Sequence, residues 1–338
     1  MGLQIGNLVS RKEVAFKDLK GKTIAVDAFN AIYQFLSSVR QPDGTPLMDS
    51  LGNVTSHLSG LFYRNIALLV EGLNLIYVFD GEYHILKGKT HEIRQIAKDL
   101  ATEKYESAVE EEDVEGMSKY ARGFSRLDDK MIAESKELLE AMGVSVYQAP
   151  GEGEMQASEL VKNGYAYAVA SQDYDALVVG GTRLIQNLTL SRKRKTVSGF
   201  VYIAPEMIEF ENVINQLGIT GDQLICLAIL VGTDFNPGGV KGIGPKKALA
   251  LVKQKIHPVS IFEEVIERHG DLGFNWREIF EIFKKPNVSK HKVVFPKFDE
   301  NKIKEILVER HEFSAERVEN QLVKLRELHS KKGQMSLF

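Results

Sequence analysis

Short apolar runs rich in β-branched residues alternate with longer stretches of helical periodicity through about the first 200 residues. The expected strands are Thr23–Val26, Leu75–Phe79, Val144–Tyr147, Tyr167–Ala170 and Arg183–Gln186. The expected helices between them are Ala28–Val39, Thr55–Gly72, Lys130–Met142 and Glu154–Asn163. This alternation predicts an α/β fold with a mostly parallel central sheet and helices on both faces. In such sheets, ligands bind at the carboxyl ends of the strands.

Helical patterns dominate the second half of the chain. A helical region is expected from Pro205 to about residue 286, followed by a β-rich patch, Lys292–Pro296, that is a strand or a loop. One or two charged helices are expected between Glu305 and Lys332. The last five residues, Gln334–Phe338, are expected to form an unstructured tail.

A highly charged helical insertion separates Asp80 from Lys130. Within it, Lys87, His91, Arg94 and Lys98 are spaced four, three and four residues apart, which places them on one face of a helix. Such stripes are most often solvated surfaces. This one begins seven residues after Asp80, a candidate ligand at a strand end, so we interpret it as a basic face over a functional site.

Composition limits the classes of protein that fit. The chain has 338 residues, a net charge of −3 and one cysteine, Cys226, in an apolar run, so disulfides and thiolate metal sites within the chain are excluded. The sequence shows no secretory signal pattern and no apolar stretch of the ~20 residues needed to span a membrane. We therefore expect a soluble, intracellular, monomeric protein that does not insert into membranes.

Acidic residues carry the strongest chemical signal. Seven acidic residues stand out: two of them end apolar runs, four form pairs separated by a single residue, and one follows a Gly-Thr turn. They are Asp27, Asp80, Glu152, Glu154, Asp173, Asp175 and Asp234. Taken alone, the last three motifs could each be a helix N-terminus or a simple turn. Together they predict one site of hard oxygen ligands, which suits two Mg²⁺ ions, with Mn²⁺ as a substitute, better than zinc. Paired ions of this kind hydrolyse phosphodiester bonds.

A glycine-rich motif, Lys241–Ala248, predicts sequence-independent binding to DNA. Gly242 and Gly244 allow the backbone to approach a phosphate closely, the amides at the start of the next helix bind the anion, and Lys246 and Lys247 add positive charge. A dinucleotide-binding loop fits poorly, because no strand precedes the motif. The basic run at residues 191–195 is equally consistent with a solvated hairpin loop and with a nucleic-acid contact.

These motifs resemble those of the flap endonucleases, in the XPG/Rad2-like superfamily of structure-specific 5′ nucleases, and most of all the archaeal form. The resemblance runs almost end to end. The matching segments are Asp27–Tyr33, Thr55–Leu58, Phe62–Arg64, Val78–Gly81, Ala149–Ala157, Ser171–Asp175, Gly232–Asp234 and Gly242–Ala248.

The resemblance implies a seven-stranded PIN-like nuclease core, a helical arch over the site and a helix-hairpin-helix region that holds duplex DNA. The seven acids match the family's metal ligands, and Lys87 and Arg94 match arch residues that contact the scissile phosphate. Tyr33 matches a base-stacking residue, and Lys98 continues the basic face toward DNA. Arg40 and Thr55 match a site for a one-nucleotide 3′ flap, and the backbone around Val240 and Ile243 matches a K⁺ site.

The resemblance also implies an order of regions along the chain. The expected regions are a nuclease region with the start of the arch at 1–99, the rest of the arch at 100–126, an internal nuclease region with the helix-hairpin-helix at 127–255, a C-terminal helical region at 256–330 and a clamp-binding tail at 331–338.

Two departures from the family pattern stand out. The family has two prolines after the Asp-Gly of its second acidic motif, whereas this chain has Glu82, Tyr83 and His84. The family's motif for the sliding clamp (PCNA) is shortened here, and Gln334, Leu337 and Phe338 are the residues expected to bind the clamp.

We therefore expect a two-metal flap endonuclease that cuts 5′-flap and double-flap DNA, with a 5′–3′ exonuclease side activity, in Okazaki fragment processing and repair. Three alternatives stay open at this point. They are another 5′ nuclease of the superfamily, such as an exonuclease or junction resolvase, an RNA-cutting nuclease with a similar acidic site, and a non-catalytic junction-binding clamp adaptor.

Overall fold

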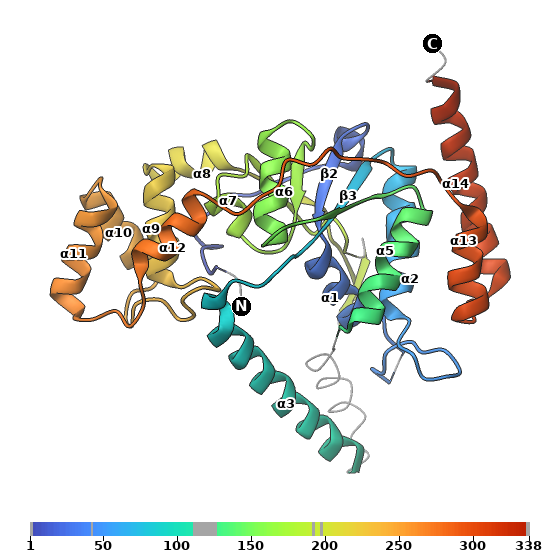
Figure 1. Cartoon of the computed structure of the whole chain (residues 1–338), viewed down its shortest axis with the longest axis horizontal. Coiled ribbons are helices and arrows are strands. Elements are labelled where there is room, and N and C mark those ends of the chain that lie inside the picture. The colour runs from blue at the N-terminus through green and yellow to red at the C-terminus, as the bar shows by residue number, and fades with distance from the viewer. Residues whose placement is uncertain (1–2, 42, 111–126, 191–192, 197–198, 336–338) are drawn as a thin grey trace.

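A computed structural model describes residues 3–41, 43–110, 127–190, 193–196 and 199–335 (Figure 1). A central sheet forms the middle of the molecule. Helices α10 (Pro245–Gln254), α11 (Pro258–His269) and α12 (Trp276–Lys284) lie at one end, and α13 (Glu300–Lys304) and α14 (Ala315–Met335) lie at the other. Helix α3 (Gly88–Glu110) projects away from the sheet.

The central sheet has seven strands in the order β1-β9-β6-β5-β2-β3-β4. Their bounds are β1 (Lys12–Glu13), β2 (Thr23–Asp27), β3 (Asn74–Phe79), β4 (Ser145–Gln148), β5 (Ala168–Ala170), β6 (Arg183–Gln186) and β9 (Glu206–Glu209). Strands β6, β5, β2, β3 and β4 run parallel, whereas β9 is antiparallel to both β6 and β1. The expected mostly parallel sheet is confirmed.

Two neighbouring strands on one side of the sheet depart from the sequence interpretation. The region from Pro205 onward was assigned to helices, but its first element is β9, and β1 was not expected at all. Both are short and carry glutamates at their ends, so neither shows the β-branched runs that marked the other strands. Their backbone pairing, with Leu184 opposite Ile208 for example, comes from tertiary contacts. Of the basic run, Lys193–Lys195 lie in a separate hairpin of β7 (Lys193–Thr196) and β8 (Gly199–Tyr202), and residues 191 and 192 lie outside the described residues.

Helices cover both faces of the sheet, as predicted. The other helices are α1 (Ala28–Ser38), α2 (Ser56–Val70), α5 (Asp129–Ala141), α6 (Gly153–Lys162), α7 (Asp175–Val178), α8 (Phe210–Leu217) and α9 (Gly221–Val231). Alternate residues of β3 enter different cores: Ile76 and Val78 pack with α6, α7 and α9, whereas Tyr77 and Phe79 pack with α1, α2, α5 and α14. Burial on both faces fixes the register, and therefore fixes where each strand ends.

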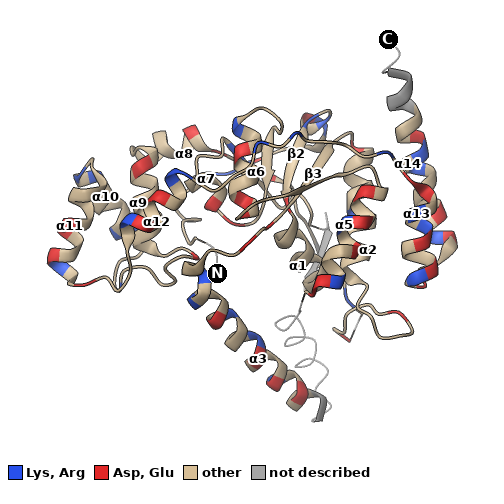
Figure 2. Cartoon of the chain, in the orientation of Figure 1, with Lys and Arg blue, Asp and Glu red and all other residues tan. Residues whose placement is uncertain are grey.

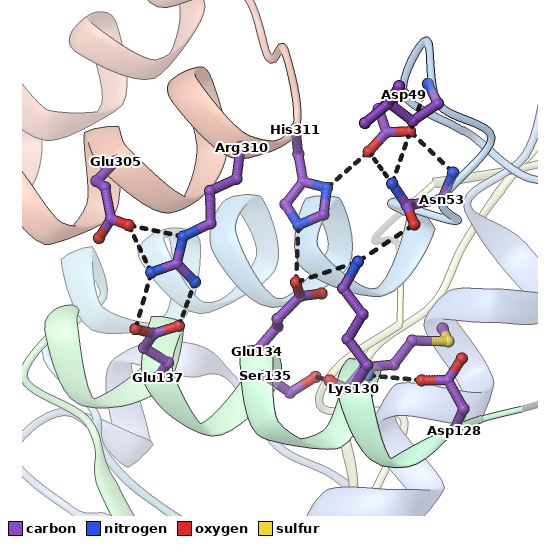
Figure 3. A network of polar contacts seen from close by, with 12 residues as sticks. Asp49, Asn53, Asp128, Lys130, Glu134, Ser135, Glu137, Glu305, Arg310 and His311 are labelled. Atoms are coloured by element: carbon purple, nitrogen blue, oxygen red, sulfur yellow. Dashed lines mark hydrogen bonds and ion pairs between the residues drawn. The ribbon is translucent and has the colours of Figure 1, made fainter.

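A buried polar network attaches the C-terminal helices to the core (Figure 3). His311 places Nδ1 2.9 Å from Asp49 and Nε2 3.2 Å from Glu134 of α5. Asn53 donates to both carboxylate oxygens of Asp49, and hydrogen bonds from Asn53 and His311 outweigh burial and lower the pKa of Asp49 to about 2. Beside them, Arg310 forms ion pairs with Glu137 of α5 and with Glu305 (Figure 3). The loop that precedes α2 is thereby fixed to the C-terminal part of the chain.

The expected tail needs one correction. Helix α14 continues to Met335, so Gln334 belongs to a helix rather than to an unstructured segment. The helix-favouring residues that precede it let the helix continue through Gly333, at a cost of about 1 kcal/mol for a helical glycine. Leu337 and Phe338 lie outside the described residues. The Lys292–Pro296 patch is a loop.

No single helix in the described part of the chain is long and apolar enough to cross a membrane; α8 and α9 meet that test only as a pair bent by 80°.

Candidate active site

The predicted acidic residues follow four neighbouring strands of the sheet. Asp27 is the last residue of β2, Asp80 directly follows β3, and Asp173 follows β5. Figure 2 shows acidic residues on the segment between β3 and α3. Glu152 precedes α6, in the connection from β4. Because β5, β2, β3 and β4 are adjacent and parallel, their carboxyl ends meet at one edge of the sheet.

Helix N-termini and backbone amides hold these carboxylates. Asp27 caps α1 and accepts from the Asn30 amide at 3.0 Å. Asp80 Oδ1 accepts a hydrogen bond from the backbone amide of Gly153 at 2.6 Å. A Cβ added at Gly153 would lie only 2.6 Å from the same oxygen. Glu154 lies in the first turn of α6. The second glycine of Gly-Glu-Gly-Glu is therefore required by the close approach of Asp80.

Burial and mutual repulsion raise the pKa values of this cluster. Burial is the main cause throughout. The pKa of Asp27 rises to about 8, with Asp80 as the next cause, and that of Asp175 to about 7, with Asp173 and Asp234 next. The pKa of Asp80 rises to about 6, and Glu152 contributes to it. The pKa values of Asp173 and Glu154 are also raised. Five of the carboxylates have raised pKa values, and the other two, Glu152 and Asp234, are among the causes. All seven carboxylates therefore lie in one cluster.

Two cations of the charged insertion reach this cluster. Lys87 forms a short ion pair with Glu152 and lies 3.6 Å from Asp234. Arg94 contacts both oxygens of Asp234. Although burial alone would lower the pKa of the Lys87 ammonium, Glu152, Asp234 and Asp175 raise it. The expected basic face over the acidic site is present, with Lys87 in a 3₁₀ turn (Ile85–Lys87) just before α3.

The donor chemistry of the cluster fits divalent metal ions. The ligands are carboxylate oxygens, one of which, Asp175 Oδ1, is buried without a hydrogen-bond partner. A cation there would satisfy that oxygen and offset the repulsion that raises the neighbouring pKa values. As they stand, no three His, Cys, Asp or Glu side chains among the described residues are arranged around one ion position. Instead, Lys87 and Arg94 form ion pairs with the carboxylates of Glu152 and Asp234.

Of the other predicted DNA contacts, Tyr33 and Lys98 lie beside this cluster, whereas Arg40 and Thr55 lie on a separate connection. Tyr33 is 38% exposed on α1, with the Lys98 ammonium 5.2 Å above its ring. Arg40 and Thr55 lie on the connection between α1 and α2, where Arg40 donates to the Gly44 carbonyl at 2.8 Å and Thr55 is buried. The connection is fixed by short bridges such as Met48 with Val54.

The predicted helix-hairpin-helix element is formed by α9, a loop and α10. Thr220 caps α9 with a capping box. In the loop, Gly242 adopts φ +83°, a conformation that favours glycine, and Gly244 caps α10. A Cβ at either position would meet no atom within 4 Å, so the backbone there is open. Lys246 and Lys247 are exposed.

Sequence reasoning missed the side chains that join the acidic residues. Ser171 donates to Glu154 at 2.5 Å, lies 3.3 Å from Asp27, and accepts from the Asp173 amide. The Asn30 side chain donates to Asp173 at 3.4 Å. Both lie within three residues of a metal-ligand candidate and next to a strand end, and that placement is the only signal that could have identified them.

Comparisons with known proteins agree with this geometry. The XPG N-terminal domain matches residues 3–101, and the XPG I-region matches residues 143–234. Flap endonuclease 1 of Aeropyrum pernix is 46% identical over 338 aligned residues, which cover 98% of this chain and 96% of that protein. This chain belongs to the flap endonuclease family.

Other relatives of this family show the same likeness. Flap endonuclease 1 of Pyrococcus furiosus is 47% identical over 329 residues, covering 96% of this chain and 95% of the relative. The structure of flap endonuclease-1 from Methanococcus jannaschii matches with a TM-score of 0.77 and 40% identity, over 98% of this chain and 100% of that one. Flap endonucleases hydrolyse phosphodiester bonds in DNA, bind branched DNA and depend on divalent metals.

Proposed function

We propose that this chain cuts 5′-flap DNA at the junction between single strand and duplex, by a two-metal mechanism. The observation that carries the proposal is the convergence of seven buried or half-buried carboxylates, from the carboxyl ends of adjacent strands and from the loop after α9, with Lys87 and Arg94 directly over them. Buried acids at this density need cations, and the two basic side chains are positioned to receive a phosphate.

The seven acids are proposed to hold two Mg²⁺ ions, for which Mn²⁺ can substitute. Asp27, Asp80, Glu152 and Glu154 form one side of the cluster, and Asp173, Asp175 and Asp234 form the other. When bound, such ions lower the pKa of a water molecule and stabilise the departing 3′ oxygen.

Lys87 and Arg94 are proposed to change partners during the reaction. In the structure both neutralise carboxylates. With the acidic charge offset by bound cations, the ammonium and guanidinium groups would be free to contact the scissile phosphate and would stabilise the negative charge that develops on it. Tyr33, exposed beside this site, is proposed to stack on the terminal base, and Lys98 to contact the backbone of the same strand.

The duplex is proposed to bind at the helix-hairpin-helix element. Amides at the N-terminus of α10 and the exposed Lys246 and Lys247 would contact phosphates without reading the base sequence. The loop carbonyls around Val240 and Ile243 are the proposed K⁺ ligands. Arg40 and Thr55 are proposed to contact a one-nucleotide 3′ flap.

The wider role is proposed from the resemblance. The chain would act as a monomer inside the cell, in Okazaki fragment processing and DNA repair, with 5′–3′ exonuclease activity on related ends. Gln334, Leu337 and Phe338 are the proposed contacts with the sliding clamp. Loss of clamp binding on deletion of residues 334–338 would support this assignment, and unchanged binding would remove it.

The test of the proposed function is cleavage of a 5′-labelled double-flap DNA with Mg²⁺, beside reactions with EDTA, with single-stranded DNA, with a blunt duplex and with an all-RNA hairpin. Metal-dependent cutting near the junction, fastest on the double flap, is expected. Binding without cutting would contradict the proposal in favour of an adaptor, and preferential cutting of the RNA hairpin would contradict it in favour of an RNA nuclease.

A further inference from the structure

The segment between Asp80 and α3 contains the residues that replace the family's two prolines. His84 occupies the N-cap of the 3₁₀ turn at Ile85–Lys87, with φ −70° and ψ 137°. Its Nδ1 accepts a hydrogen bond from the Leu86 amide at 3.3 Å, and its carbonyl accepts from the Lys87 amide at 2.9 Å. The side chain and the backbone of His84 thus both organise the turn that carries Lys87.

The His84 ring also connects this turn to the far side of the acidic cluster. It meets Phe235 edge-to-face, with ring centroids 5.8 Å apart. Phe235 directly follows Asp234, is buried, and packs edge-to-face on Phe283 of α12 at 5.5 Å. The Lys87 ammonium lies 5.3 Å from the Phe235 ring centroid. Phe235, which belongs to the loop of Asp234, therefore contacts both His84 and Lys87 in the 3₁₀ turn.

Tyr83 makes a corresponding contact with the first turns of α3. Its ring meets the His91 ring at 4.4 Å with an interplanar angle of 74°, although Tyr83 itself is 63% exposed. Thr90, beside His91, donates to the Asp234 carbonyl at 2.6 Å. Arg94 follows His91 by three residues and lies on the same helix face, so these contacts set the direction in which α3 leaves the site.

We propose that Tyr83 and His84 form a clasp that positions Lys87 and Arg94 over the acidic cluster, in place of rigid proline backbone. The inference rests on the proposed function of those two cations. Proline fixes φ near −65°, and His84 already adopts φ −70°. This chain reaches the same backbone conformation through side-chain contacts. Tyr83 and His84 are positioning residues, because they act through Lys87 and Arg94.

The test compares His84→Ala with His84→Pro. His84→Ala removes the cap and the ring contact, and we expect single-turnover cleavage of a double-flap DNA to slow about tenfold, as for a small misplacement of catalytic groups. The Kd for the same DNA should change less than twofold, since the helix-hairpin-helix is untouched. His84→Pro restores the backbone restriction without the imidazole and should recover most of the rate. Tyr83→Ala should produce an intermediate loss.

Hydrogen–deuterium exchange of the metal-free proteins gives a readout independent of activity. Amides of residues 85–94 should exchange faster in His84→Ala than in the wild type, and return toward the wild type in His84→Pro. His257→Ala is the matched control, because His257 occupies the N-cap of α11 but makes no side-chain cap hydrogen bond. That variant should leave both the rate and the exchange unchanged.

Several results would overturn the clasp. His84→Ala that cuts and exchanges like the wild type would remove it. His84→Pro that is as slow as His84→Ala would show that the imidazole matters for another reason than backbone position. Faster exchange across β2 and β3 as well would indicate general destabilisation. If the wild-type protein itself fails to cut, the proposed function fails, and the exchange data alone decide on the clasp.

Discussion

Arg94 approaches Asp234 with a single guanidinium nitrogen, Nη2, which lies 2.9 Å and 2.7 Å from the two carboxylate oxygens. The Arg94 side chain is 44% exposed, whereas that of Asp234 is 11% exposed. The guanidinium therefore lies at the mouth of the site, where a phosphate can replace Asp234 as its partner.

Arg94→Ala tests that exchange of partners. The variant should bind flap DNA nearly as well as the wild type but cleave it about 10²–10³-fold more slowly, because a preorganised cation is lost where charge develops. Single-turnover rates beside binding titrations make the measurement. An equal loss in binding and cleavage would instead assign Arg94 to general DNA affinity.

Ser171→Ala tests the link between Glu154 and Asp27. The hydroxyl donates to Glu154 and accepts from the Asp173 amide, so its loss should weaken Mn²⁺ binding by about 10–100-fold, as for other groups that orient metal ligands. Ser171→Thr keeps the hydroxyl and should retain most of the affinity. Calorimetry with Mn²⁺ gives the values, and wild-type affinity in Ser171→Ala would refute the role.

Gly153→Ala tests the close approach of Asp80. The added methyl would lie 2.6 Å from Asp80 Oδ1 and 3.1 Å from the Val78 carbonyl, which forces the carboxylate away from its amide donor. Cleavage should fall about 10²-fold, the scale of a small misplacement at a reacting centre. Gly221→Ala, whose methyl would meet only Phe210 at 3.5 Å, is the control expected to keep activity. Full activity in Gly153→Ala would show that the Asp80 carboxylate does not depend on that amide.

The sequence predicted the centre of this molecule better than its edges. Strands β2, β3 and β6 begin and end within a residue of the expected positions, because each contains a short buried apolar run. Strands β1 and β9 were missed, since neither contains a long apolar run and their pairing forms only in the folded sheet. Six of the acidic residues were found because they lie near a strand end or at the start of a helix, and Asp234 was found because it follows a Gly-Thr turn after α9. The partners of Lys87 could not be predicted, because spacing along a helix does not show which acid faces it.

His57 should make stability depend on pH. Burial lowers its pKa to about 3, and repulsion from His311 contributes; neither ring nitrogen has a hydrogen-bond partner. Between about pH 3 and its unfolded pKa of about 6.5, the unfolded chain binds one more proton at this position than the folded chain. Stability should therefore fall as the pH drops below 6.5, by about 2 kcal/mol from this group at pH 5.

Urea unfolding of the wild type and of His57→Leu at pH 7.5 and pH 5 measures that contribution. The loss of stability on acidification should be smaller in the variant by roughly the stated amount. A loss of equal size in both proteins would mean that His57 is protonated in the folded state.

The central claim is that the seven carboxylates hold two catalytic metal ions. Counting Mn²⁺ ions bound per chain, by electron paramagnetic resonance of the free ion in wild type and Asp175→Ala, tests it most directly. We predict two ions per chain in the wild type and at most one in Asp175→Ala, with flap cleavage lost but DNA binding kept in that variant. No binding in the wild type, or two ions and full cleavage in Asp175→Ala, would contradict the account.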